Sequence, residues 1–178
     1  MIYNKVMIIY IGADHRGFKL KEFLKRNLEE SGYEVVDLGN NQYDENDDYV
    51  DFAAAVAFKV SLDYENSRGI LICGSGVGMD IVANKFINVR SVLAFLPDQA
   101  FDSRNDDDTN ILCLPADFIS NDQALKIVYT WLQTPFSDED RFIRRLEKIL
   151  KLELKNFRSI EERGIDDEKG SDDEQQWR

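Results

Sequence analysis

The segment 69–80 places a cysteine directly before a glycine-rich turn. It runs GILICGSGVGMD, with Cys73 at the end of an apolar stretch, followed by Gly74, Gly76 and Gly78. The apolar stretch predicts a short buried strand, and the amphipathic stretch after the glycines predicts a helix. Backbone N–H groups converge at such a junction, and the helix dipole favours negative charge there. This setting can depress a thiol pKa below its free value of about 8.5, so Cys73 is a candidate base or nucleophile; the alternative is an inert core thiol.

The glycine turn lacks the signatures of the commoner phosphate and nucleophile motifs. No Gly-Lys-Ser/Thr follows it, and its spacing differs from the Gly-x-Gly-x-x-Gly of dinucleotide sites. Ser75 has Cys73 and Val77 where a nucleophile elbow requires glycine, and Met79 stands where a Cys-x5-Arg phosphatase requires arginine. What remains is a cradle for an oxyanion, with a thiol and the Ser75 hydroxyl beside it.

A second polar group follows the first predicted strand. Residues 12–17 spell GADHRG, and His15 is the only histidine of the chain. A lone histidine is commonly structural, but this one lies at a strand end between an acid and an arginine. Asp14 could accept a proton or hold a hydroxyl, and His15 and Arg16 could both face an anion.

Predicted strands and helices alternate along the chain. The strands are expected at 6–11, 34–38, 69–73, 91–95 and 110–114, and the helices at 18–30, 49–62, 77–87, 98–104, 122–132 and 139–155. This pattern predicts an α/β protein with a Rossmann-like parallel sheet between two helical layers. Ligands of such sheets bind at the carboxyl ends of the strands, which would bring together residues 12–16, 74–78 and 96–98.

Composition indicates a single globular domain with an acidic tail. The chain has 178 residues, is 43% hydrophobic and carries a net charge of −12, which argues against nucleic acid or an anionic membrane as a partner. Residues 161–178 contain eight acidic and three basic residues. We therefore expect a domain over 1–157 and a disordered tail over 158–178.

The cysteine count and the hydropathy pattern bear on the cellular setting. Neither of the two cysteines belongs to a zinc-binding spacing or a disulfide framework, so no metal site is expected. No signal peptide and no stretch long enough to span a membrane is evident. We expect a cytoplasmic protein.

Arginines gather on the last predicted helix. Arg141 and Arg145 are four residues apart and therefore share a face, with Arg144 beside them. On its own this pattern is typical of an ordinary solvated helix face.

Taken together, these stretches resemble the type B ribose-5-phosphate isomerase and galactose-6-phosphate isomerase family of sugar-phosphate isomerases. The matching stretches are 12–21, Asp48-Tyr49, 69–85, Ser103-Arg104, 108–110, and Arg141 with Arg145 and Glu147. The resemblance implies a three-layer α/β/α sandwich with a five-stranded parallel sheet. It also implies aldose–ketose isomerisation of a sugar phosphate without a cofactor. Members form homodimers or dimers of dimers, with each active site built from two chains.

Roles for the glycine-rich segment follow from the resemblance. Cys73 matches the general base that moves a proton between C1 and C2. Ser75 and the amides of Gly74, Gly76 and Gly78 match the cradle of the enediolate.

The remaining matches concern the substrate. Asp14 and Tyr49 match residues near the sugar hydroxyls. His15, Arg141 and Arg145 match phosphate contacts, with the arginines supplied by the closing helix of the partner chain.

The sequence departs from the family pattern at charged positions. Asp106 and Asp107 stand where the family usually has His-Asn, and that histidine helps to open the furanose ring; we keep Asp106 as a candidate catalytic group and Asp107 as a candidate substrate contact. Asp117 replaces a phosphate-binding arginine, and Phe142 replaces a histidine. Acids near a phosphate dianion should weaken its binding unless they are directed away or protonated.

These departures leave more than one substrate open. The leading hypothesis is interconversion of ribose 5-phosphate and ribulose 5-phosphate through an enediolate with a cysteine base. The alternatives are an isomerase of another aldose phosphate, such as a hexose 6-phosphate, and a catalytically impaired paralogue that binds a sugar phosphate.

Overall fold

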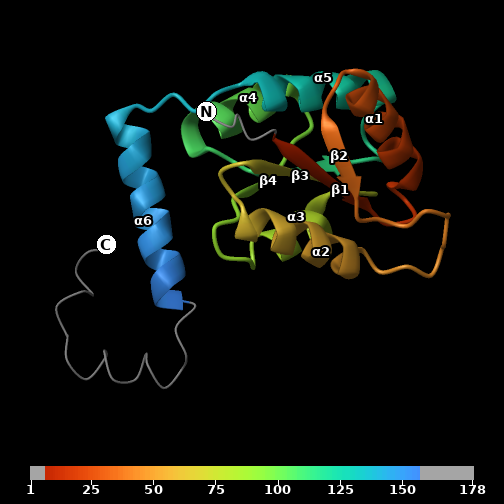
Figure 1. Cartoon of the computed structure of the whole chain (residues 1–178), viewed down its shortest axis with the longest axis horizontal. Helices are drawn as coiled ribbons and strands as arrows, with labels where there is room; N and C mark the ends of the chain where they lie inside the picture. Colours follow the sequence, from red (N-terminus) through yellow and green to blue (C-terminus); the bar gives the residue numbers. More distant parts are fainter. Residues whose placement is uncertain (1–6, 157–178) are drawn as a thin grey trace, which may run out of the picture.

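Five strands form one parallel sheet. In a computed structural model that describes residues 7–156, they are β1 (Ile8–Ala13), β2 (Glu34–Asp37), β3 (Ser67–Cys73), β4 (Ser91–Leu93) and β5 (Ile111–Pro115). Their order across the sheet is β2-β1-β3-β5-β4, and every neighbouring pair is parallel (Figure 1). The predicted α/β class is therefore confirmed.

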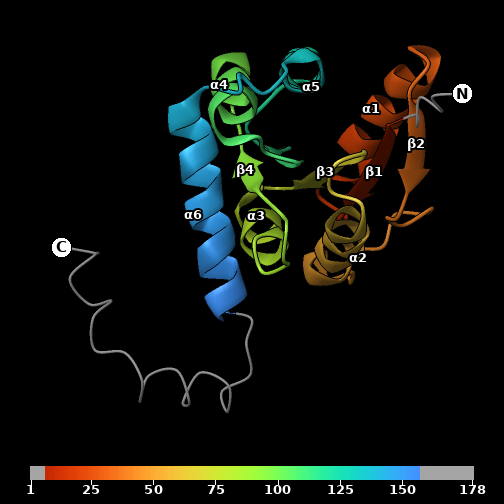
Figure 2. The ribbon, with the colours of Figure 1, turned by 60° about the vertical axis from the view of Figure 1, so that its left-hand side comes forward.

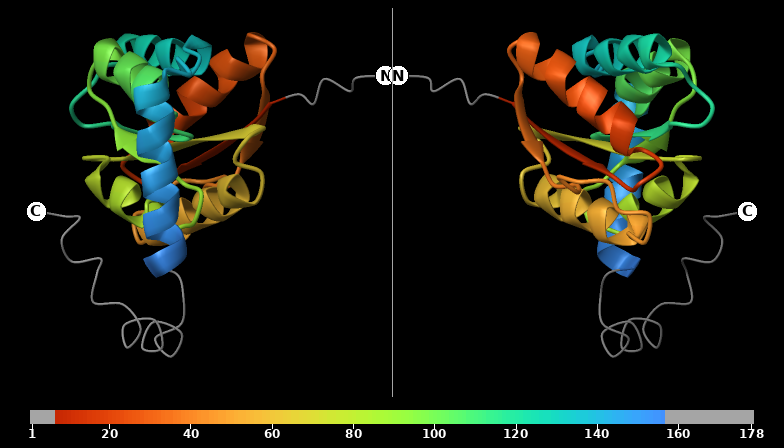
Figure 3. Two further views of the ribbon diagram at one scale, coloured as in Figure 1. Left: turned by 90° about the vertical axis from the view of Figure 1, so that its left-hand side faces the viewer. Right: turned by 90° about the vertical axis from the view of Figure 1, so that its right-hand side faces the viewer.

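Helices cover both faces of the sheet. They are α1 (Phe18–Glu30), α2 (Tyr49–Leu62), α3 (Val77–Ala83), α4 (Pro97–Asp107), α5 (Asn121–Gln133) and α6 (Asp140–Asn156). Helices α1, α4 and α5 lie on one face and α2 and α3 on the other, which confirms the three-layer sandwich (Figures 1 and 3). Helix α6 stands at the β4 side of the sheet (Figure 2).

Alternation along the strands divides the buried residues between the two layers of helices. In β3, Ile70 and Ile72 pack with α1, α4 and α5, whereas Leu71 and Cys73 pack with α2 and α3. Because both faces are covered, the central strands are apolar at almost every position, as buried parallel strands are.

Helices α1 and α2 have the predicted bounds, but α3 is shorter than expected. The sequence predicts a helix over 77–87, whereas α3 ends at Ala83. The side chain of Asn84 both accepts from the Ser91 N–H (3.0 Å) and donates to the Ser91 carbonyl (3.2 Å). This pair of bonds turns the chain toward β4 instead of continuing the helix.

Strand β4 is also shorter than predicted. It stops at Leu93 rather than 95, because the backbone N–H groups of Phe95 and Leu96 donate to the Gln99 side chain (2.8 and 3.2 Å) and not to the sheet. Gln99 thereby caps the start of α4.

The order of the last two strands changes which loops meet. Strand β5 lies between β3 and β4, and all five of its residues are buried. Strand β4 lies at the edge of the sheet, and its three residues are only partly buried. The segment beside the glycine turn is therefore 116–118, which follows β5. The predicted neighbour, 96–98, follows β4 and is therefore one strand further from the glycine turn than 116–118, since alternation and apolarity do not encode strand order.

Helix α6 contributes little to the core of this chain. Of its residues, Phe142 alone is buried. Its exposed apolar side chains are Ile143, Ile149, Leu150, Leu152 and Leu154. Among residues 7–156, no helix is both long and apolar enough to cross a bilayer. The predicted tail, 158–178, lies outside the described residues.

Candidate active site

The turns after β1, β3 and β5 lie side by side at the carboxyl edge of the sheet. The β1–β3 register ends at Ala13 and Ile72, so Asp14 and Cys73 come next on neighbouring strands. On the other side of β3, the Ala116 N–H donates to the Cys73 carbonyl (2.9 Å). The sheet thus positions Asp14 and Cys73 next to each other, at the place where parallel sheets bind ligands.

Cys73 is held against a backbone donor of the glycine turn. Its side chain is buried, and the Gly76 N–H lies 3.1 Å from the Cys73 Sγ. Gly76 has a φ of +74°, a left-handed conformation that favours glycine, and a Cβ there would lie 2.4 Å from Leu93 Cδ1. The amide is aimed where it stabilises negative charge on sulfur.

The rest of the glycine turn provides an open side with a hydroxyl and an aromatic ring. Ser75 is exposed at the tip of the turn. A Cβ on Gly78 would lie 2.6 Å from the Tyr49 ring, so the bare backbone lets that ring approach the cradle. Tyr49 is the first residue of α2, and the Asp48 side chain caps this helix by accepting from the Val50 N–H (3.0 Å).

Asp14 is a buried carboxyl at the end of β1. Its Oδ1 accepts from the Gly17 N–H (2.9 Å), and a Cβ on Gly17 would lie 2.3 Å from the Ile72 carbonyl oxygen. This close approach holds the turn against β3. Burial raises the pKa of Asp14 above its usual range, against the lowering effect of the Gly17 N–H.

His15 is oriented by an aspartate that the sequence did not single out. Both the His15 backbone N–H (3.0 Å) and the ring Nδ1 (2.7 Å) lie against Asp47 Oδ1. Asn40 donates to the other oxygen of Asp47 (3.0 Å). The bond to Asp47 raises the pKa of His15. No local pattern in the acidic loop distinguishes Asp47 from its neighbours, because the contact forms only when the loop folds back onto the turn after β1.

Asp117 does not present an unpaired charge to the cradle. It forms an ion pair with Arg16, and its backbone N–H donates to the Gly74 carbonyl (3.0 Å). The expected repulsion between Asp117 and a substrate phosphate is thus opposed by an adjacent guanidinium.

The remaining predicted site residues form a separate group. Asp106 and Asp107 end α4, which runs back from the carboxyl edge to the amino edge of the sheet, away from Cys73. Arg141 and Arg145 lie in the first half of α6, beside α4 (Figure 2). The structure does not bring these four residues to Cys73 within one chain.

Within that second group, charges are partly paired. Asn105 donates to Asp106 Oδ1 (2.7 Å), and Arg141 forms an ion pair with Glu139 (2.8 Å). Burial raises the pKa of Asp107, and the charge of Asp106 adds to that rise, whereas Arg145 opposes it. The charges of Arg145 on α6 and Asp107 on α4 therefore interact across the junction of the two helices.

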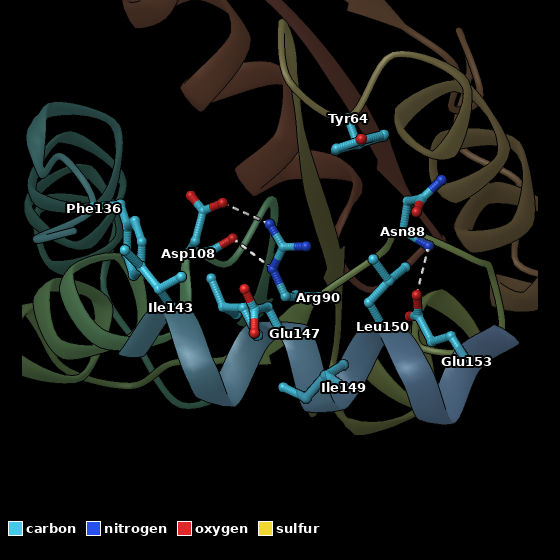
Figure 4. A pocket seen from close by; sticks show the side chains of 11 residues that line it. Tyr64, Asn88, Arg90, Asp108, Phe136, Ile143, Glu147, Ile149, Leu150 and Glu153 are labelled. Carbon is cyan, nitrogen blue, oxygen red and sulfur yellow. Dashed lines mark hydrogen bonds and ion pairs between the residues drawn. The ribbon is translucent and has the colours of Figure 1, made fainter. Parts of the chain in front are cut away.

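A cavity of about 280 Å³ separates α6 from the amino edge of the sheet (Figure 4). Arg90 and Asp108 form an ion pair on one wall (2.7 Å), and the Asn88 N–H donates to Glu153 of α6 (3.2 Å). Apolar side chains of α6, including Leu150, form the other wall. None of the predicted site residues lines this cavity, so it is distinct from the Cys73 cradle.

The second cysteine has a structural setting. Cys113 is fully buried in β5, 3.3 Å from the Ser91 hydroxyl, and burial raises the pKa of its thiol well above its usual value. Among residues 7–156, no group of three or more His, Cys, Asp or Glu side chains is arranged to hold a metal ion.

Comparison with known proteins identifies the family. The sequence profile described as ribose/galactose isomerase matches residues 9–149. A Mycoplasma genitalium protein named probable ribose-5-phosphate isomerase B is 41% identical over 82% of this chain and 95% of its own length. Ribose-5-phosphate isomerase B of Escherichia coli is 39% identical over 82% and 95%.

Solved structures agree with these sequence matches. The crystal structure of ribose-5-phosphate isomerase B from Mycoplasma genitalium with bound ribulose 5-phosphate has a TM-score of 0.80 at 40% identity, covering 83% of this chain and 96% of that one. The type B enzyme of Trypanosoma cruzi has a TM-score of 0.79 at 39% identity, covering 84% and 97%. The resemblance read from the motifs is therefore confirmed: the chain belongs to the ribose/galactose isomerase family of aldose–ketose isomerases.

Proposed function

We propose that this protein interconverts ribose 5-phosphate and ribulose 5-phosphate, with Cys73 as the base. The observation that carries the proposal is the buried Cys73 Sγ facing the Gly76 N–H, next to Asp14 on the neighbouring strand. The relatives named ribose-5-phosphate isomerase B, one of them with ribulose 5-phosphate bound, support this choice of substrate.

The chemistry follows from the placement of these groups. The Cys73 sulfur takes the proton from C2 of the open-chain aldose, an enediolate forms, and the same sulfur returns the proton to C1. The N–H groups of the 74–78 turn and the Ser75 hydroxyl stabilise the charge that develops on the enediolate oxygens. Asp14, with its raised pKa, exchanges a proton with a sugar hydroxyl, and Tyr49 bounds the sugar on the α2 side.

The phosphate and the ring-opening step require a second chain in this proposal. His15 contacts the phosphate from the same chain as Cys73, while Arg141 and Arg145 reach it from a partner copy. Asp106 and Asp107 belong to the same partner-supplied half. The exposed apolar side chains of α6 support a homodimer, because a helix that buries one residue in its own chain has apolar surface left for another.

No cofactor enters this scheme, since the thiol, the backbone amides and the carboxyls carry every proton and charge. We also place the protein in the cytoplasm, in line with two buried cysteines that form no disulfide.

An isomerase assay on a panel of five- and six-carbon aldose phosphates tests the proposal. Ribose 5-phosphate should be the preferred substrate, and Cys73→Ala should remove turnover while ribose 5-phosphate still binds in calorimetry. Preference for a hexose 6-phosphate would assign the protein to another aldose phosphate. Binding without turnover by the wild-type protein would identify a sugar-phosphate-binding paralogue.

A further inference from the structure

An ion pair crosses the first residue of the Cys73 cradle. Arg16 reaches from the turn after β1, and Asp117 from the turn after β5, and their charged groups meet beside Gly74. A Cβ on Gly74 would lie 2.4 Å from the Arg16 Nε, 2.5 Å from its Cζ and 2.7 Å from Asp117 Oδ2. The pair therefore occupies the space that a side chain at position 74 would fill.

The two partners are fixed to different degrees. The Asp117 backbone N–H donates to the Gly74 carbonyl (3.0 Å), so the backbone that carries its short side chain is anchored to the rim of the cradle. The Arg16 side chain is long and 58% exposed, and it meets Asp117 through Nη2. A guanidinium has five N–H donors in a planar fork, so other edges of the Arg16 group face solvent above the cradle.

Such a pair is suited to exchange. Exposed ion pairs contribute little to stability, because water competes with both partners and long side chains lose freedom when they pair. A phosphate dianion carries more charge than one carboxylate and matches the guanidinium fork through two oxygens. It can thus take Arg16 from Asp117 at little cost to the fold.

We propose that Arg16 is a further anion-binding residue at the Cys73 cradle and that Asp117 is its resting counter-ion, which an incoming phosphate displaces. The identity of the anion rests on the proposed function; the exchange itself rests on the Arg16–Asp117–Gly74 geometry. Asp117 then acts as a specificity-determining residue, because a neutral sugar or a weak anion cannot release Arg16 from its carboxylate. His15 lies next to Arg16 in the same turn.

Charge-neutralising variants test this exchange with controls that change the same charge elsewhere. Arg16→Gln should raise both the KM for ribose 5-phosphate and the inhibition constant of inorganic phosphate about tenfold, with kcat within about twofold. Asp117→Asn should lower both constants about two- to fivefold, because the competing charge is removed and the backbone bond to Gly74 is kept. The exposed residues Lys19 and Asp102 provide matched controls as Lys19→Gln and Asp102→Asn, and neither should move the constants.

The double variant Arg16→Gln/Asp117→Asn shows whether Asp117 competes with the anion for Arg16 or affects anion binding independently of Arg16. If Asp117 acts by holding Arg16, Asp117→Asn should change nothing in the Arg16→Gln background. The proposal would be overturned if Arg16→Gln left the KM and the phosphate inhibition constant unchanged, or if Asp117→Asn raised them. Phosphate affinity measured by calorimetry gives the same comparison without turnover, so a protein inactive on ribose 5-phosphate would refute the proposed function and still decide whether Arg16 and Asp117 exchange.

Discussion

The Cys73 cradle and the charged group at the α4–α6 junction are built in opposite ways. In the cradle, strand register and hydrogen bonds fix each side chain. The Gly76 N–H faces the Cys73 sulfur, and the Gly17 N–H donates to Asp14. Asp47 orients His15. At the junction, α6 buries Phe142 alone, and the Arg141 side chain is 57% exposed. A single chain thus positions the proposed base and its neighbours, whereas the arginines that we propose to bind phosphate stand on a helix that buries only Phe142 among its described residues.

The two cysteines give the sharpest version of this comparison. Cys73→Ala should lower kcat by about 10²- to 10⁴-fold, the usual effect of losing a general base, with little change in the melting temperature. Cys113→Ala should keep turnover within about twofold and lower the free energy of unfolding by about 1 kcal/mol, because a fully buried thiol is removed. Steady-state rates and urea unfolding of both variants check this contrast. Equal losses of turnover would mean that the cradle is not the centre of the reaction.

Mixing two inactive chains tests whether the regions meet across a dimer. A Cys73→Ala chain lacks the base, and an Arg141→Ala chain lacks a phosphate contact, so each homodimer should be nearly inactive. After subunit exchange, a random mixture should recover about a quarter of wild-type activity, because half of the dimers are hybrids with one intact site. Native mass spectrometry verifies the exchange. No recovery in verified hybrids would place both residues in a site made by one chain.

Asp106 tests whether the junction takes part in proton transfer as well as binding. Asp106→Asn should lower kcat for ribose 5-phosphate about tenfold, because the amide cannot exchange a proton with the closed ring. Asp106→His should keep kcat and lower KM, since it retains an exchangeable proton and removes one negative charge. The exposed Asp102→Asn change on the same helix is the control. An unaltered kcat in Asp106→Asn would assign ring opening to another group.

Sequence patterns predicted the cradle well because its strand, turn and helix are consecutive in the chain. The apolar stretch ending at Cys73 and the glycines after it specify a strand, a tight turn and a helix within a dozen residues, and Gly76 adopts the left-handed conformation that such a turn requires. The bounds of α1 and α2, which also follow from local patterns, were predicted correctly.

Contacts between distant segments could not be predicted in this way. The Asp47 carboxylate meets His15 across 32 residues, and Asp117 meets Arg16 across 101. Nothing local distinguishes Asp47 from its acidic neighbours, and only the family resemblance placed Asp117 near a phosphate; neither contact follows from the local pattern. The position of β5 between β3 and β4 brings Asp117 to the glycine turn and puts the segment after β4 one strand further away. The residues that face a second chain depend on how two copies assemble, and they cannot be predicted from the periodicity of one chain.

The smallest expected effect concerns the His15–Asp47 pair. As the only histidine, His15 gives a single imidazole titration in NMR, and its midpoint should lie above the ordinary value of about 6.5, because the Asp47 carboxylate favours the charged ring. Asp47→Asn should lower that midpoint and should move it more than Arg141→Ala does, since Asp47 contacts the ring directly within one chain.

The same pair makes stability depend on pH in a defined direction. A histidine whose pKa is raised by folding stabilises the protein fully below its unfolded pKa, and that contribution is lost as pH rises through the folded value. The wild-type protein should therefore exceed Asp47→Asn in free energy of unfolding more at pH 6 than at pH 8, as urea titrations at the two pH values would show. If the midpoint moved with Arg141→Ala and not with Asp47→Asn, the prediction would be wrong. The pKa of His15 would then depend on the partner's half of the site and not on its own chain.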